Sequence, residues 1–242
     1  MIDYASLFCG AGLFDIPFEL PEFRCVLATD SDHEACLWYG RNRIAPVLTR
    51  DVGELHPQIA AKLVLCTPPC QQFSLVNPKA KGFNDKHTAR LFRHAARVCR
   101  EMSAELVLLE NVEGLVRRGW APAVTEVFAE YGFSGQWKVM DASDYGVPQR
   151  RKRVVFAFDR HGKEFPWPEP EPGARQCSVA TTATTLAESR LLQQIPAWFR
   201  LPAGRAGRRM SGNGVPLGLA NAIRDAALRF FSQAPGPPAR SQ

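Results

Sequence analysis

Residues 2–12 read IDYASLFCGAG, an apolar run that ends in two closely spaced glycines. The β-forming residues 2–8 predict a strand, and glycines after a strand let the backbone pass close to a nucleotide. Asp30 ends the next predicted strand about twenty residues further on, where an acid can accept hydrogen bonds from both hydroxyls of a ribose. The segment therefore predicts a nucleotide-binding edge on a parallel sheet.

Short β-rich runs alternate with helical patterns over the first two thirds of the chain. We expect strands over residues 2–8, 24–29, 63–66, 106–110 and 153–158. We expect helices over residues 32–39, 88–102 and 121–131, and two more over residues 186–194 and 216–231. The alternation predicts an α/β fold with a mostly parallel sheet and helices on both faces.

Composition narrows the class of protein. The chain has 242 residues, of which 45% are hydrophobic and 22% charged, enough for one substantial core. A net charge of +6 favours a polyanionic partner, although ordinary basic enzymes carry a similar balance. Asp3 stands where a leader would carry basic residues, and no apolar run spans a bilayer, so we expect a cytoplasmic protein without membrane contact. Seven cysteines without zinc spacing predict reduced thiols and no metal.

The sequence changes character after residue 158. Residues 165–172 read FPWPEPEP, and prolines lack the backbone donor that a helix or sheet needs, so this segment is expected to be a stiff connector. We expect a basic, glycine-containing loop over residues 201–209, and residues from 232 onward are expected to be frayed.

Two side chains at strand ends are candidates for chemistry. Cys70 lies in TPPCQQFS, residues 67–74, where two prolines stiffen the turn that leaves a buried strand and would hold a nucleophilic thiol. Taken alone, a cysteine beside a strand is more often buried and inert. Glu110 ends another strand, and a partly buried carboxyl there would hold a proton for a substrate ring nitrogen, unless it only caps the next helix.

Two further patterns lie near the same sheet edge. Asp51 follows an apolar segment and could accept from an adenine amino group, although a loop aspartate is more often a solvated turn residue. The run QRRKR at residues 149–153 precedes a strand, and alternation places Gln149, Arg151 and Arg153 on one side. A basic run is usually a solvated face, yet the turn at residues 144–148 would hold guanidiniums against a base carbonyl or phosphate.

Together these motifs resemble the cytosine-5 DNA methyltransferase family. In chain order they are FCGAG at residues 8–12, PCQ at 69–71, ENV at 110–112, QRRKR at 149–153 and GNGVP at 212–216. The resemblance covers about residues 4–223. It implies a Rossmann-like S-adenosylmethionine-dependent methyltransferase fold, double-stranded DNA as substrate, and a target base flipped out of the helix.

The resemblance also implies residue roles. Cys70 would add to carbon 6 of cytosine while Glu110 protonates or hydrogen bonds nitrogen 3, so that carbon 5 takes the methyl group and S-adenosylhomocysteine is released. Arg151 and Arg153 would position the base and steady Glu110, and residues 71–87 would form a mobile loop that closes over DNA. The matching cofactor positions are Phe8, Gly10, Gly12, Asp30, Asp51, Pro69, Leu91, Asn213 and Val215. The expected substrate contacts are Gln71, Ser74, Asn111 and Gln149, with Arg205, Arg208 and Arg209 against phosphates.

The chain departs from the family pattern in places. Ser6 replaces an acid, Leu13 and Thr67 replace glycines, Ser31 stands where a residue able to cover the adenine often lies, and Gly214 replaces a small hydroxyl residue or alanine. Only about 25 residues lie where the family carries its target recognition domain, below the roughly 50 of even a small domain. We therefore expect short or relaxed sequence specificity, or a partner protein that supplies it.

These considerations divide the chain into four parts. We expect a catalytic and cofactor-binding domain over residues 1–160, a connector with a vestigial recognition segment over 161–210, a returning C-terminal helix over 211–231, and a disordered tail over 232–242. The favoured function is DNA cytosine-5 methylation, as in restriction–modification, in a prokaryotic or phage-encoded protein associated with the nucleoid. Two alternatives stay open: a tRNA cytosine-5 methyltransferase of the same family, and a catalytically silent DNA-binding subunit, against which the intact Cys70, Glu110 and Arg153 argue.

Overall fold

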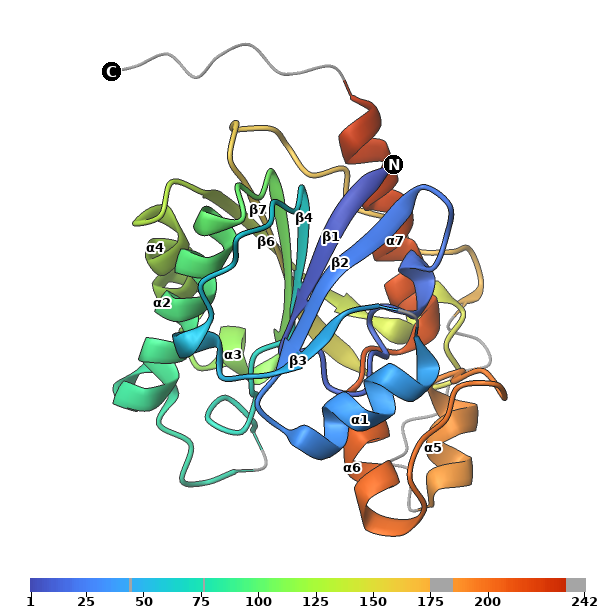
Figure 1. Ribbon diagram of the computed structural model, residues 1–242. Helices are drawn as coiled ribbons and strands as arrows, with labels where there is room; N and C mark the ends of the chain where they lie inside the picture. The colour runs from blue at the N-terminus through green and yellow to red at the C-terminus, as the bar shows by residue number, and fades with distance from the viewer. Residues whose placement is uncertain (44, 76, 175–184, 234–242) are drawn as a thin grey trace.

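A single seven-stranded sheet organises the molecule (Figure 1). The computed structural model describes residues 1–43, 45–75, 77–174 and 185–233. The strand order is β3-β2-β1-β4-β5-β7-β6. The five strands from β3 to β5 in this order run parallel, while β7 is antiparallel to both of its neighbours, β5 and β6. The strands are β1 (Ile2–Leu7), β2 (Phe23–Asp30), β3 (Val47–Thr49), β4 (Leu63–Cys66), β5 (Leu106–Val112), β6 (Ser134–Asp141) and β7 (Lys152–Asp159).

Helices cover both faces of this sheet, which confirms the predicted fold class (Figure 1). On β5, Val107 and Leu109 pack with α2 and α4, while Leu106 and Leu108 pack with α7 on the other face. The alternation of side chains along a strand produces this two-sided core. The helices are α1 (His33–Asn42), α2 (Lys86–Glu101), α3 (Gly114–Arg117), α4 (Ala121–Ala129), α5 (Leu186–Leu192), α6 (Gly204–Asn213) and α7 (Leu217–Ser232), with 3-10 turns η1 (Ile16–Phe18), η2 (Val52–Glu54), η3 (Gly82–Asn84) and η4 (Ala142–Tyr145).

The expectation of a loop over residues 201–209 is wrong, because helix α6 begins at Gly204. Its three glycines and basic residues give a weak helical signal, but tertiary contacts override it. A Cβ at Gly207 would lie 1.9 Å from the Pro202 carbonyl oxygen and 3.0 Å from Leu186, so glycine permits close packing against α5. The Ser211 hydroxyl also lies 2.7 Å from the Ser189 hydroxyl. Helix α6 runs through residue 210, so the expected segment boundary there falls inside an element.

Two strands escape the sequence patterns. Strand β3 has only three residues, and β6 contains Gly135, which lowers strand propensity. A Cβ at Gly135 would lie 2.6 Å from the Phe158 ring, so the glycine allows β6 to approach that ring closely. The expected tail from residue 232 lies mostly outside the described residues, while α7 itself extends to Ser232.

A buried polar cluster supports the turn that follows β1. The Asp15 carboxylate accepts hydrogen bonds from Ser6 Oγ at 3.0 Å and Tyr39 Oη at 2.8 Å. Arg43 donates to the Gly12 carbonyl at 2.6 Å and forms an ion pair with Glu19. Ser6, which replaces the acid of the family pattern, therefore contacts an acid from the following loop.

Candidate active site

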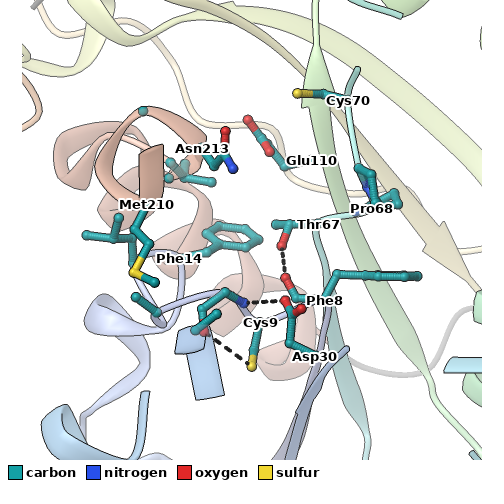
Figure 2. A pocket seen from close by; sticks show the side chains of 18 of the residues that line it. Phe8, Cys9, Phe14, Asp30, Thr67, Pro68, Cys70, Glu110, Met210 and Asn213 are labelled. Atoms are coloured by element: carbon teal, nitrogen blue, oxygen red, sulfur yellow. Dashed lines mark hydrogen bonds between the residues drawn. The ribbon is translucent and has the colours of Figure 1, made fainter. Parts of the chain in front are cut away.

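A cavity of about 250 Å³ lies where β1, β2, β4 and β5 end. Figure 2 shows Phe8 and Asp30 at one end of it and Cys70 and Glu110 at the other, with Met210 and Asn213 on the facing segment. Carboxyl ends of parallel strands are the usual place for ligands in open α/β sheets, because the crevice there is free of crossover connections. The topology therefore gathers residues that are more than a hundred positions apart in the chain.

The turn over residues 8–12, called the glycine turn below, lines the cavity at the end where Asp30 lies. Phe8, Gly10 and Gly12 all have positive φ, at 56°, 55° and 89°. A Cβ at Gly10 would meet no protein atom within 4 Å, and Gly10 lines the cavity, so its backbone is open to a ligand. At Gly12 a Cβ would lie 2.7 Å from Arg43 and 2.9 Å from Tyr39, so this glycine is required by packing.

Asp30 is fixed beside this turn by backbone donors. One carboxylate oxygen accepts from the Gly10 amide at 2.9 Å and the other accepts from the Asp32 amide at 2.9 Å. Burial raises the pKa of the Asp30 carboxyl, and the two amide bonds oppose that shift. Each oxygen keeps a lone pair for a further donor, as recognition of ribose hydroxyls requires.

The other expected cofactor positions fall into two groups. Pro69, Asn213 and Val215 line the cavity together with Phe8, Gly10 and Asp30. Gly12, Asp51 and Leu91 do not line it: the Asp51 carboxylate accepts from the Gly53 amide at 2.7 Å, and Leu91 packs in the core. The structure thus brings six of the nine positions to one cavity.

Cys70 sits on a turn that is tied to the next strand. The Asn111 side-chain amide, which is buried, donates to the Pro68 carbonyl at 3.0 Å. The Cys70 carbonyl accepts from the amides of Phe73 and Ser74 at 2.9 and 3.0 Å. These bonds fix the thiol at the edge of the cavity, where Gln71 also lies. Asn111 therefore supports the turn in addition to lining the cavity.

Glu110 forms a nearly buried ion pair with Arg153. Arg153 Nε lies 2.8 Å from Glu110 Oε1, and the two side chains are 13% and 6% exposed. The pair depends on the antiparallel register of β5 and β7, where Glu110 lies opposite Val155 and Arg153 is two residues along the same face. Burial raises the pKa of the Glu110 carboxyl, and the charges of Arg153 and Arg151 oppose this. Burial is the larger effect, so this carboxyl takes up a proton more readily than a solvent-exposed glutamate does.

The pKa of the Cys70 thiol is also raised. Burial is the main cause and the negative charge of Glu110 the second, while Arg153 and Arg151 lower it. Burial and this charge therefore favour the thiol form of Cys70 over the thiolate. Proton positions on Cys70 and Glu110 are coupled through their proximity.

Arg151 connects the catalytic end to the turn after α6. Its Nη2 donates to the carbonyl oxygens of Gly212 and Gly214, which flank Asn213. Burial lowers the pKa of Arg151 to about 9, which leaves the guanidinium protonated at neutral pH. Gln149, two residues earlier in the chain, is buried and does not line the cavity. The guanidinium of Arg151 therefore fixes the carbonyls on both sides of a cavity-lining residue.

The expected DNA contacts do not lie together. Ser74 uses its carbonyl to accept from Arg118 Nη2 at 3.2 Å, and Arg205 and Arg208 are exposed on α6 away from the cavity. Arg209 instead lines the cavity and forms ion pairs with Asp32 and Glu34. The basic run of α6 therefore divides between the protein surface and the cavity.

The site also contains residues that the sequence patterns did not reveal. Phe14 and Met210 line the cavity, and Asp15, Tyr39 and Arg43 support its glycine turn. A methionine or phenylalanine in an ordinary apolar pattern is expected in the core, so the sequence does not indicate that it lines a cavity. Among the described residues, no group of three metal-binding side chains occurs. In the same part of the chain, no helix combines the length and apolarity needed to cross a membrane.

Two departures from the family pattern occupy the same space. A Cβ at Gly214 would lie 2.3 Å from Leu13 Cδ1 and 2.9 Å from Leu13 Cβ. Both residues line the cavity. Leu13 therefore fills the volume that a side chain at position 214 would need, which makes the two departures a matched pair.

We predict that Gly214→Ala destabilises the fold by about 1–3 kcal/mol through overpacking. Leu13→Ala should remove most of that effect, giving a coupling energy of at least about 0.5 kcal/mol in the double-mutant cycle. Urea unfolding of the four proteins measures both quantities. Gly212→Ala is the control, since a Cβ there meets nothing within 4 Å. Additive effects of the two substitutions would contradict the pairing.

We predict that Glu110→Gln makes Cys70 more reactive toward iodoacetamide at pH 8. Removing the carboxylate charge lowers the pKa of the thiol, so the thiolate fraction at a fixed pH rises, and the lower nucleophilicity of a less basic thiolate offsets part of the gain. The expected increase is about two- to fivefold, measured by mass spectrometry of the Cys70 peptide. Glu113→Gln, which removes a carboxylate paired with Lys152, is the control. An unchanged or slower rate in Glu110→Gln would exclude this coupling.

Comparison with known proteins identifies the family. The model of the family described as C-5 cytosine-specific DNA methylase matches residues 2–184. The type II methyltransferase M.AquIA of Picosynechococcus is 33% identical over 190 residues, covering 69% of this chain and 76% of that protein. M1.HphI of Haemophilus parahaemolyticus is 30% identical over 181 residues, covering 70% of this chain and 49% of that protein. The chain thus spans about half the length of the second relative.

Solved structures share the fold over almost the whole chain. A DNA modification methyltransferase encoded within an E. coli prophage has a TM-score of 0.77 at 15% identity, covering 96% of this chain and 100% of that one. The Dnmt2 methyltransferase of S. pombe has a TM-score of 0.68 at 14% identity, covering 96% and 99%. At these identities the likeness is one of fold alone. The matched family model spans all the strands of the sheet and includes Cys70 and Glu110. The chain therefore belongs to the C-5 cytosine-specific DNA methylase family.

Proposed function

We propose that this protein transfers a methyl group from S-adenosylmethionine to carbon 5 of cytosine in double-stranded DNA, through a covalent adduct on Cys70. One observation carries the proposal: Cys70, Glu110 and Arg153 line the same cavity as the glycine turn and Asp30. A nucleophile, an acid and a nucleotide-binding edge in one cavity are the parts that this reaction needs. Family membership supports the reaction class.

The residues of the cavity fit S-adenosylmethionine. When bound, the cofactor supplies an electrophilic methyl group on a sulfonium. Asp30 would accept from the ribose hydroxyls and Asp51 from the adenine amino group, while the open backbone at Gly10 admits close approach. The remaining proposed contacts are Phe8, Pro69, Asn213 and Val215 in the cavity lining, with Gly12 and Leu91, which like Asp51 lie outside that lining.

We infer that Cys70 and Glu110 act on the cytosine ring together. A solvent base takes the proton of the Cys70 thiol as the sulfur bonds to carbon 6, while Glu110 gives its proton to nitrogen 3 and so removes the developing negative charge. Carbon 5 thereby becomes the nucleophile. After methylation a solvent base takes the carbon 5 proton, the bond from sulfur to carbon 6 breaks, and nitrogen 3 returns its proton to Glu110.

Arginines stabilise this arrangement of charges. Arg153 would hold the Glu110 carboxyl in place through its ion pair and contact the base from the same side. Arg151 would keep Asn213 at the cavity by binding the carbonyls on both sides of it. Gln149 is proposed to hold the loop that precedes them, and Gln71, Ser74 and Asn111 to lie near the flipped nucleotide.

The segment over residues 71–87 is proposed to close over DNA. Its base is anchored in an aromatic cluster, where Phe73 packs against Phe83 and Phe92, and Phe83 stacks on Trp120 at 6.1 Å. This packing would confine movement to the tip, which carries Lys79 and Lys81. Positive side chains at a moving tip can contact phosphates and exclude water from the cavity.

Target choice is proposed to be relaxed or supplied by a partner protein. Arg205 and Arg208 are exposed on α6 and would contact DNA phosphates, which position a protein without specifying a sequence. The names of the bacterial relatives, type II methyltransferases, support a role in a restriction–modification system. Action in the cytoplasm, at the nucleoid, is proposed with it.

Methyl transfer from labelled S-adenosylmethionine to unmethylated genomic DNA and to tRNA, measured side by side, tests this function. We expect DNA to be labelled, and Cys70→Ala to lower the rate at least about a thousandfold because the covalent step is lost. Cys25→Ala, which removes a half-buried thiol outside the cavity, should stay within about twofold of the parent. Bisulfite sequencing of the product reports the breadth of target sites.

Each other outcome points to an alternative. Labelling of tRNA alone would reassign the substrate to RNA. Failure to label either nucleic acid, with the cofactor bound, would favour a catalytically silent subunit. Full activity in Cys70→Ala would contradict the covalent mechanism.

A further inference from the structure

The end of the cavity that is proposed to hold the adenosine has a small side chain directly after Asp30. Residue 31 is a serine, whose small side chain lines the cavity but offers little surface to a purine ring. Aromatic and other planar side chains commonly cover bases, because stacking on a ring face is favourable for any base. Position 31 therefore leaves room for a planar side chain from another element.

Helix α6 presents a planar side chain to that end. Arg209 lines the cavity together with Ser31, Asp32 and Met210. Arg209 Nη1 lies 2.9 Å from Asp32 Oδ2, and Nη2 lies 3.4 Å from Glu34 Oε2. The two acids stand at the start of α1, directly after Asp30 and Ser31 in the chain. The guanidinium thus extends from one wall of the cavity to the other.

The backbone that carries Arg209 is firmly placed. Met210 packs with Leu13 and Phe199 in an apolar cluster, and Ser211 bonds Ser189 at 2.7 Å. Arg151 holds the carbonyls of the turn that follows α6. A change of position at Arg209 is therefore a movement of its side chain rather than of the helix.

The ion pairs are of a kind that can open. Arg209 is 51% exposed, and Asp32 and Glu34 are 32% and 47% exposed. Half-exposed pairs contribute little to stability and weaken with salt. They nevertheless fix the orientation of a guanidinium, which is planar and stacks on aromatic faces. Such a contact can hold a ligand and still release it.

We propose that Arg209 closes the adenosine end of the cofactor cavity, covering the purine beside Ser31 while Asp32 and Glu34 hold its guanidinium in place. The proposal rests on the proposed S-adenosylmethionine site and adds a binding residue to it. Arg209 thereby acts on the cofactor rather than on a DNA phosphate.

Binding of S-adenosylhomocysteine without DNA tests this assignment. Arg209→Ala should weaken affinity by roughly five- to tenfold in calorimetry, mainly through faster dissociation in a stopped-flow displacement experiment. Arg41→Ala removes an equal charge and a contact with Trp38 from α1 and should leave affinity unchanged. Thermal unfolding of each variant without ligand should match the parent, which separates a binding effect from misfolding.

Asp32→Asn tests the role of the ion pair. Asparagine keeps the helix N-cap that Asp32 provides to the amides of Glu34 and Ala35 but removes the charge that binds Arg209. This variant should speed dissociation in the parent background and have no further effect on Arg209→Ala. Dissociation from the parent should also quicken with added salt, and dissociation from Arg209→Ala should not.

Three results would overturn the assignment. They are unchanged binding by Arg209→Ala, equal losses in Arg209→Ala and Arg41→Ala, and additive effects of Asp32→Asn and Arg209→Ala. If the parent protein itself does not bind S-adenosylhomocysteine, the proposed cofactor and function fail as well. If the parent binds it and one of the three results occurs, only the assignment of Arg209 fails.

Discussion

The buried ion pair between Glu110 and Arg153 is the interaction on which the Cys70 end of the cavity depends. It lies where the parallel part of the sheet meets its antiparallel strand, and only the register between β5 and β7 places the two side chains on one face. Burial of the carboxyl outweighs the opposing charges, so its pKa is raised. The charge of the same carboxyl contributes to the raised pKa of the Cys70 thiol, which couples the two side chains.

The opposite end of the cavity is held by backbone conformation, packing and a buried polar cluster. Positive φ values at Phe8 and Gly10 shape the turn, and the buried cluster around Asp15 supports it. Departures from the family pattern are explained by local contacts: Ser6 bonds Asp15, and Leu13 occupies the space beside Gly214. Thr67, which replaces a glycine, donates to the Phe8 carbonyl at 2.7 Å. These substitutions therefore alter the supporting contacts while the cavity is retained.

The sequence predicted the parts of the site that follow directly from strand ends. Cys70, Glu110 and Asp30 were assigned because a side chain after a parallel strand must lie at the carboxyl edge of the sheet. Helix α6 and the place of Arg209 could not be predicted, since both depend on contacts between segments distant in the chain: Gly207 against Pro202, and Arg209 with Asp32. The pairing of Leu13 with Gly214 likewise has no local signal, because it arises only when α6 meets the glycine turn.

Intact-mass analysis of the protein with a short duplex containing 5-fluorocytosine and S-adenosylmethionine tests the central claim most directly. Fluorine at carbon 5 cannot leave as a proton does, so elimination of the sulfur is blocked after methylation. We predict a stable complex with the summed mass of protein, DNA strand and one methyl group, with the linkage mapped to Cys70 and absent from Cys70→Ala. A methylated duplex with no covalent complex, or a linkage at another residue, would contradict it.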